Sequence, residues 1–127
     1  MDNPPRPPAE LPADALRHLD SLWSGSLGAA YAAYHPPTPP FLALAAALVE
    51  ISVELHGVGT PIPTEPARLL LGDLCLARAS RLLAEAAEHR IQIGFARAIE
   101  AVTAAAAEQQ PLPPLRPTLS RLLRETS

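Results

Sequence analysis

The sequence contains no lysine, one cysteine and few aromatic residues. All ten basic residues are arginine, which excludes a Schiff base, a lysine general base and a P-loop. Cys75 has no second cysteine to pair with, so an internal disulfide is excluded and a reducing cytoplasm is the expected location. Aromatic residues make up 4% of the chain, and this scarcity, with few β-branched runs, argues against a sheet. The composition predicts an all-α fold.

The sequence also lacks a basic charge excess and a long hydrophobic run. The formal net charge is -3 and the pI is about 5.7, so no positive field exists to attract nucleic acid or an anionic membrane. The longest strongly apolar run, 41–49, is followed by Glu50 and Glu54, and it is too short for a membrane-spanning helix, which needs ~20 apolar residues. We expect no nucleic-acid partner, no transmembrane segment and no signal peptide.

Proline is abundant, with 16 residues that divide the chain into segments. We interpret residues 1–12 as a disordered proline-rich arm, 13–108 as a helical domain, and 109–127 as a proline-rich linker with a short C-terminal helix. Apolar spacing and proline positions predict helices from Asp14 to the "YHPPTPP" stretch, over 41–56, over 64–88, over 90–108, and after Pro117.

The helix predicted over 64–88 contains an unusual Gly-Asp pair. Gly72 costs about 1 kcal/mol relative to alanine in a helix, and it shares a side with Ala79 and Ala86, which favours a close approach by another helix. Asp73 lies beside the same apolar stripe, so we expect it to find an arginine, a capping role or water. An additional flank of Leu70, Leu74 and Ala77 predicts that the N-terminal half is covered on two sides. We therefore expect this helix in the middle of an assembly.

The helix predicted over 90–108 follows after only "EHR", which favours a helical hairpin or a kinked continuation. Its apolar stripe is well formed, because Ile91, Phe95, Ala98, Ile99, Val102 and Ala106 recur at helical spacing.

The stretch "PARLLLGDLCLARASRLLAEAAEHRIQIGFARAIEAVTAAAAE" resembles a segment of the trans-polyprenyl diphosphate synthases. In that family a helix of the form "LLGDYLLARAxxLLA" precedes a short break and a second helix ending in "AIxxxxEGE". The matching positions are Leu70, Leu71, Gly72, Asp73, Leu76, Ala77, Arg78, Ala79, Leu82, Leu83, Ala84, Ala98, Ile99 and Glu108. The resemblance covers about residues 41–108 and implies a small helical bundle like the N-terminal half of the isoprenoid synthase fold.

Catalytic members of the family carry an aspartate-rich motif at the end of the preceding helix, where it binds magnesium and the allylic diphosphate. The corresponding segment here, "ALVEISVELHGVG", keeps His56 but has Gly57 and Val58 where the first aspartates would stand. The only aspartates are Asp2, Asp14, Asp20 and Asp73. No two of them lie within one helical turn, so the paired carboxylates that hold Mg²⁺ against a diphosphate are absent.

The sequence also ends soon after the 90–108 helix, so the second aspartate-rich motif and the distal helices of the family have no counterpart. It is most similar to the small, non-catalytic subunit of heterodimeric synthases, such as component I of heptaprenyl diphosphate synthase. The resemblance implies no catalytic residue, no metal ligand and no cofactor in this chain, with Mg²⁺ on a catalytic large subunit. We expect a hetero-oligomer in which this chain supports that partner and influences prenyl chain length.

Synthases of this fold pair through helices that follow the first aspartate-rich motif. The resemblance therefore implies an interface on the two helices predicted over 64–88 and 90–108. The candidate interface residues are Leu70, Leu74, Ala77, Phe95 and Ile99. The candidate helix-packing residues are Gly72, Asp73 and Ala79.

Several smaller patterns have a plain structural interpretation beside a functional one. Glu50, Glu54 and His56 resemble metal ligands, but a polar strip and a helix-end histidine are favoured because a metal needs more convergent ligands. Glu85 and His89 are interpreted as a surface pair four residues apart. Cys75 has no basic neighbour to activate it, so we expect core packing.

The stretch "PLPPLR", 111–116, fits a PxxPxR pattern of the kind that SH3 domains bind, although a proline linker is the favoured explanation. The alternative function is a self-associating helical adaptor that uses its proline-rich arms to bind other proteins and is unrelated to isoprenoid metabolism. A neighbouring gene encoding a long chain with two aspartate-rich motifs would favour the small-subunit hypothesis. An independent enzyme would need a compact acid, base or metal cluster, and the sequence shows none.

Overall fold

The computed structural model describes residues 19–35, 38–58 and 65–124, and every regular element in these ranges is helical. The predicted all-α fold is confirmed. The elements are α1 (Asp20–Leu22), the π-helical turn η2 (Trp23–Leu27), α2 (Gly28–Tyr34), α3 (Pro40–Leu55), α4 (Pro66–Ala86), α5 (His89–Ala107) and α6 (Leu115–Arg124). The structure therefore has the helices expected from the proline positions, with ends that differ by a few residues. Thr64, the expected start of the third helix, lies outside the described residues.

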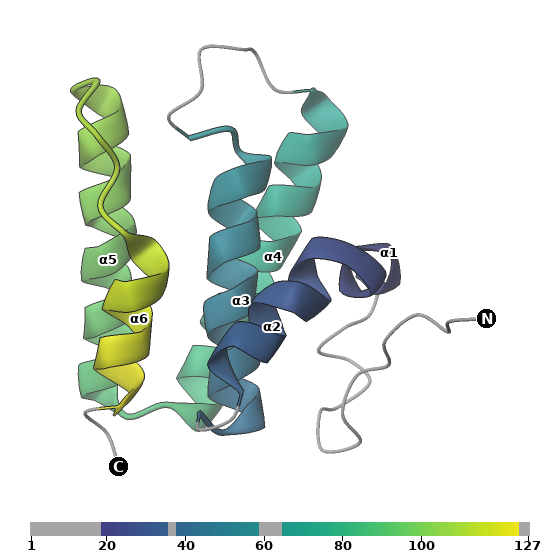
Figure 1. The fold of residues 1–127 in the computed structure, drawn as a ribbon, viewed down its shortest axis with the longest axis vertical. Coiled ribbons are helices and arrows are strands. Elements are labelled where there is room, and N and C mark those ends of the chain that lie inside the picture. The colour runs from purple at the N-terminus through teal and green to yellow at the C-terminus, as the bar shows by residue number, and fades with distance from the viewer. Residues whose placement is uncertain (1–18, 36–37, 59–64, 125–127) are drawn as a thin grey trace.

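Helix α3 lies at the centre of the bundle. All residues from Leu42 to Val49 are buried, at 9% exposure or less, so this helix is apolar on all sides, as fully enclosed helices are. Figure 1 shows α4 running antiparallel beside it, while α2 and α6 lie against other sides. Within the described residues α3, and not the helix over 64–88, has the central place, and the second apolar flank of α4 is left exposed at Leu70 and Ala77.

The first helical segment is interrupted at Gly25, whose φ of -127° and ψ of -118° are not helical. Trp23 and Leu27 remain buried on either side of the interruption, and the rings of Trp23 and Tyr31 lie 5.2 Å apart. Asp14 and Leu16, which the sequence placed at the start of this helix, lie outside the described residues. The segment ends at Tyr34, directly before the predicted proline stop.

Helix α3 ends in a Schellman motif at Gly57. Gly57 has a φ of 66°, its amide donates to the carbonyl of Glu54 at 3.0 Å, and the amide of Val58 lies 3.4 Å from the carbonyl of Val53. Glycine adopts this left-handed conformation without a Cβ penalty. The motif fixes His56 at the helix end, next to α4.

Helix α5 does not form a hairpin with α4. It lies on the opposite side of α3 from α4, beside α6 (Figure 1), and buries Ile91, Phe95, Ala98 and Val102. Helix α6 in turn buries Leu119 and Leu123, at 0% and 4% exposure. Helix α6 thus contributes to the same core as the helices before it.

Among the described residues, no helix combines the length and the apolarity that crossing a membrane requires.

Candidate functional site

The end of α3 is joined to α4 by a hydrogen bond between His56 and Asp73. The Nε2–H of His56 donates to Oδ1 of Asp73 over 2.7 Å, and Oγ of Ser52 lies 3.3 Å from Nδ1 of the same ring. The side chains of His56 and Asp73 are 25% and 70% exposed. This connection differs from the expectation that Asp73 would find an arginine, a cap or water. It depends on the Schellman motif, which holds His56 at the helix end.

Gly72 is the reason that the His56 ring fits there. A Cβ at this position would lie 3.0 Å from Cε1, 3.1 Å from Nδ1 and 3.2 Å from Nε2 of the ring, which is tighter than most contacts of a Cβ, so the ring would have to shift by a few tenths of an ångström. Ala79, on the same side of α4, is fully buried at 0% exposure. The two residues of the Gly-Asp pair therefore act together, because Gly72 leaves space for the imidazole and Asp73 accepts its hydrogen bond.

The order Ser52, His56, Asp73 invites comparison with a hydrolase triad. A nucleophilic serine must reach its substrate, whereas Ser52 is 3% exposed within α3, and both nitrogens of His56 already have polar neighbours. We therefore interpret the three residues as a structural connection. In the part of the chain that the structure describes, no group of three or more histidine, cysteine, aspartate or glutamate side chains is arranged to hold a metal ion.

Glu50 forms a forked ion pair with Arg116 of α6. Arg116 Nε lies 3.2 Å from Oε1 and 3.1 Å from Oε2 of Glu50, and Nη2 lies 2.9 Å from Oε1. The hydrogen bond to Glu50 raises the pKa of the Arg116 guanidinium. Burial, together with the negative charge of Glu50, raises the pKa of Tyr34 above its ordinary value. Glu50 therefore links α3 to α6, whereas His56 links the end of α3 to α4.

The ion pair also changes the interpretation of "PLPPLR". Leu115 and Arg116 belong to α6, and the guanidinium that an SH3 domain would need is held by Glu50. An SH3 ligand binds as an extended polyproline helix, so this structure does not present the motif in a form that such a domain recognises.

Two other sequence patterns have defined positions. Arg81 Nε lies 3.2 Å from Oε1 of Glu85, while α4 ends at Ala86 and His89 begins α5. The interpretation of Glu85 and His89 as one helical pair was therefore wrong. Cys75 is fully buried, and burial raises the pKa of its thiol to about 11, which makes it an unreactive core residue as expected.

The outer side of α4 carries exposed apolar residues in its N-terminal half. We call the surface formed by Leu69, Leu70, Asp73, Leu74 and Ala77 the α4 face. Leu70 is 70% exposed and Leu69 38%, Leu74 is half-buried, and Ala77 is exposed. Its single charged side chain, Asp73, is the partner of His56. The sequence-predicted Leu70, Leu74 and Ala77 thus share one surface.

The two candidate interface residues of α5 are placed differently. Phe95 is 1% exposed within the core, because it lies on the stripe that faces the other helices, and we remove it from the interface candidates. Ile99 is half-buried and packs against the edge of the core.

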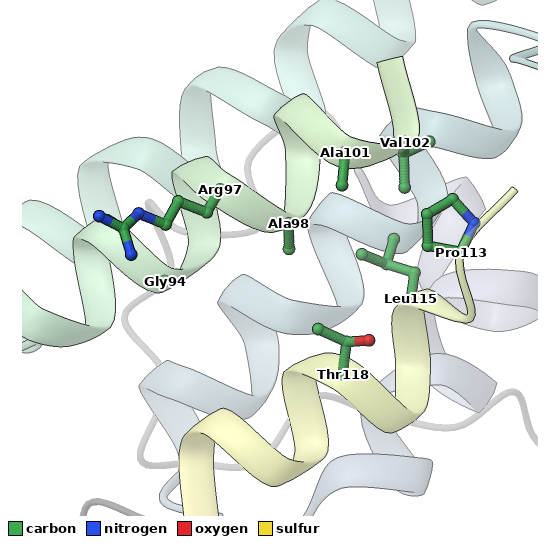
Figure 2. A pocket seen from close by; sticks show the side chains of 8 residues that line it. All are labelled: Gly94, Arg97, Ala98, Ala101, Val102, Pro113, Leu115 and Thr118. Carbon is green, nitrogen blue, oxygen red and sulfur yellow. The ribbon is translucent and has the colours of Figure 1, made fainter. Parts of the chain in front are cut away.

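A shallow groove of about 240 Å³ separates α5 from the start of α6 (Figure 2). Small and apolar side chains such as Ala98, Val102 and Leu115 form most of its wall, and Arg97 is its one ionisable lining residue. Figure 2 shows the Arg97 side chain extending along α5, away from Pro113 and Leu115. The groove offers no acid-base pair, so it gives no basis for catalysis.

No protein-family model, curated protein or solved structure matches this chain.

Proposed function

We propose that this chain is the non-catalytic small subunit of a heteromeric trans-polyprenyl diphosphate synthase. It docks on a larger, aspartate-bearing catalytic subunit through the α4 face and influences the length of the prenyl product. The observation that carries the proposal is the exposure of Leu69, Leu70 and Ala77 around the residues that resemble the family's Gly-Asp helix.

Leu70 is the residue of the α4 face that gains most from docking. Its 70% exposure leaves most of the side chain in water, whereas full burial of a leucine contributes about 1.5–3 kcal/mol. The neighbouring Leu69 and Leu74 extend the same surface, and Asp73 is the only charged residue between positions 69 and 77. A surface that is apolar around a single charge is typical of a protein interface.

The chemistry of the proposed complex is divided between its subunits. The large subunit binds Mg²⁺ and the two diphosphate substrates, because the four aspartates of this chain do not form a pair one helical turn apart. This chain contributes the α3 and α4 helices, whose contact is fixed by His56, Gly72 and Asp73.

The adaptor alternative has no comparable observation in its favour. Its proline motif at 111–116 runs into α6, where Glu50 binds Arg116.

The test is co-expression with a large subunit that carries two aspartate-rich motifs, followed by size-exclusion chromatography and a product-length assay. We expect one complex, and we expect that omission of either chain abolishes or alters long-chain product formation. Separate elution of the two chains would contradict the proposal. So would turnover of isopentenyl diphosphate by this chain alone.

A further inference from the structure

Asp73 is the one charged residue in the middle of an apolar surface. Its neighbours at three and four positions along α4 are Leu69, Leu70, Leu76 and Ala77, so no cation on its own helix lies within pairing distance. The carboxylate is 70% exposed. His56 occupies Oδ1, and Oδ2 has no hydrogen-bond partner among the residues that the structure describes.

A partner that covers Leu70 and Ala77 must also cover this carboxylate. Removing an ionised carboxylate from water without a counter-charge is costly. The hydrogen bond from His56 satisfies Oδ1 alone, so a covering surface would bury Oδ2 without a partner. That surface therefore has to supply a donor to Oδ2, and a cationic donor also balances the charge of the carboxylate.

We infer that the α4 face binds a helix surface that is uncharged except for one arginine, which pairs with Oδ2 of Asp73. This inference rests on the proposed function, because the partner is the large catalytic subunit. An arginine fits better than a lysine, since its planar guanidinium is more weakly hydrated and binds a carboxylate with directed hydrogen bonds. The His56 hydrogen bond fixes the carboxylate in one orientation and leaves Oδ2 available for that contact.

The test is titration calorimetry of the large subunit with the wild-type chain and with Asp73→Asn. Asparagine removes the charge but keeps a side-chain oxygen that accepts from His56, so the connection between α3 and α4 is retained. We expect Asp73→Asn to weaken binding by roughly tenfold or more, as expected for loss of one partner of a buried charge pair. The control Glu85→Gln removes an exposed carboxylate near the other end of α4, and we expect a change below about twofold.

Two further measurements separate a charge contact from a positioning role. Binding of the wild-type chain should weaken with added salt more than binding of Asp73→Asn. Asp73→Arg should abolish binding, and reversal of the matching arginine of the large subunit to aspartate should restore it.

The outcomes separate this inference from the proposed function. If Asp73→Asn binds as tightly as wild type while Leu70→Glu does not bind, the arginine inference is overturned and the docking surface stands. If His56→Asn weakens binding as much as Asp73→Asn, Asp73 acts by positioning α3 and the inference is again overturned. If the wild-type chain does not bind the large subunit, both proposals fall.

Discussion

Leu122 of α6 lies so close to Gly94 of α5 that a methyl group on Gly94 would stand 2.5 Å from its Cδ2 and 2.6 Å from its Cδ1. The two helices therefore pack at a distance that only glycine permits with this leucine rotamer. Together with the Glu50–Arg116 ion pair, this contact holds α6 in the bundle.

Gly94→Ala should stabilise the protein by less than the gain of about 1 kcal/mol that helix propensity gives, because the flexible end of the half-buried Leu122 has to move away from the new methyl group. In a Leu122→Ala background the same substitution should give the full gain, because the methyl group then has space. Urea unfolding of the four variants measures both effects. An equal gain in the two backgrounds would contradict the close contact.

Gly72→Ala should displace the ring of His56. Its contacts with Ser52 and Asp73 and the Schellman motif at Gly57 restrain the ring, so we expect a loss of about 1 kcal/mol rather than the gain that helix propensity alone gives. In a His56→Ala background, Gly72→Ala should raise the free energy of unfolding by about 1 kcal/mol, because the ring is gone and the gain in helix propensity remains. The same sign in both backgrounds would show that His56 does not pack on Gly72. Thermal unfolding with NMR of the His56 ring tests this.

Cys75 provides a prediction about pH. Its pKa is raised from 9.0 to about 11 by burial in the folded state, so the unfolded chain loses this proton first as pH rises. The contribution of the protonated Cys75 thiol to the free energy of unfolding is complete below pH 9 and is lost as pH rises through about 11. Tyr34, whose pKa is also raised, adds to the loss above pH 10. Stability measured from pH 8 to 10 should therefore fall less in Cys75→Ala than in wild type. Identical slopes would contradict the burial of an ionisable thiol.

Gln109, two residues after the end of α5, has a φ of 56°. Its amide donates to the carbonyl of Ala106, and the amide of Gln110 donates to the carbonyl of Ala105. This is a Schellman motif with a residue other than glycine in the left-handed conformation, which costs about 1 kcal/mol. Gln109→Gly should raise the free energy of unfolding by up to about 1 kcal/mol, measured by urea unfolding. Gln110→Gly is the control, and we expect it to be neutral or destabilising. A loss of stability in Gln109→Gly would be the contrary result.

The sequence predicted the helices well because proline positions and apolar spacing are local signals. Pro40 and Pro66 begin α3 and α4, and Gly57 ends α3. The central position of α3 was missed because a run that is apolar on all sides does not indicate which neighbours cover it. The second apolar flank of α4 was instead interpreted as evidence of a central helix.

The candidate site depended on contacts between distant positions. His56 and Asp73 are 17 residues apart, and Glu50 and Arg116 are 66 apart. Neither contact follows from helical periodicity, because it depends on how α3 packs against α4 and α6. Gly72 was the one local signal of the site, since a glycine inside a helix indicates close approach by a neighbour.

The most direct test of the docking surface is the affinity of the large catalytic subunit for Leu70→Glu, measured by titration calorimetry beside wild type. The control is Ala104→Glu, which places the same charge on an exposed position of α5. We predict that Leu70→Glu loses binding by roughly a hundredfold or more, because it buries an unpaired carboxylate, and that Ala104→Glu binds like wild type. Equal affinity of Leu70→Glu and wild type would contradict docking through the α4 face.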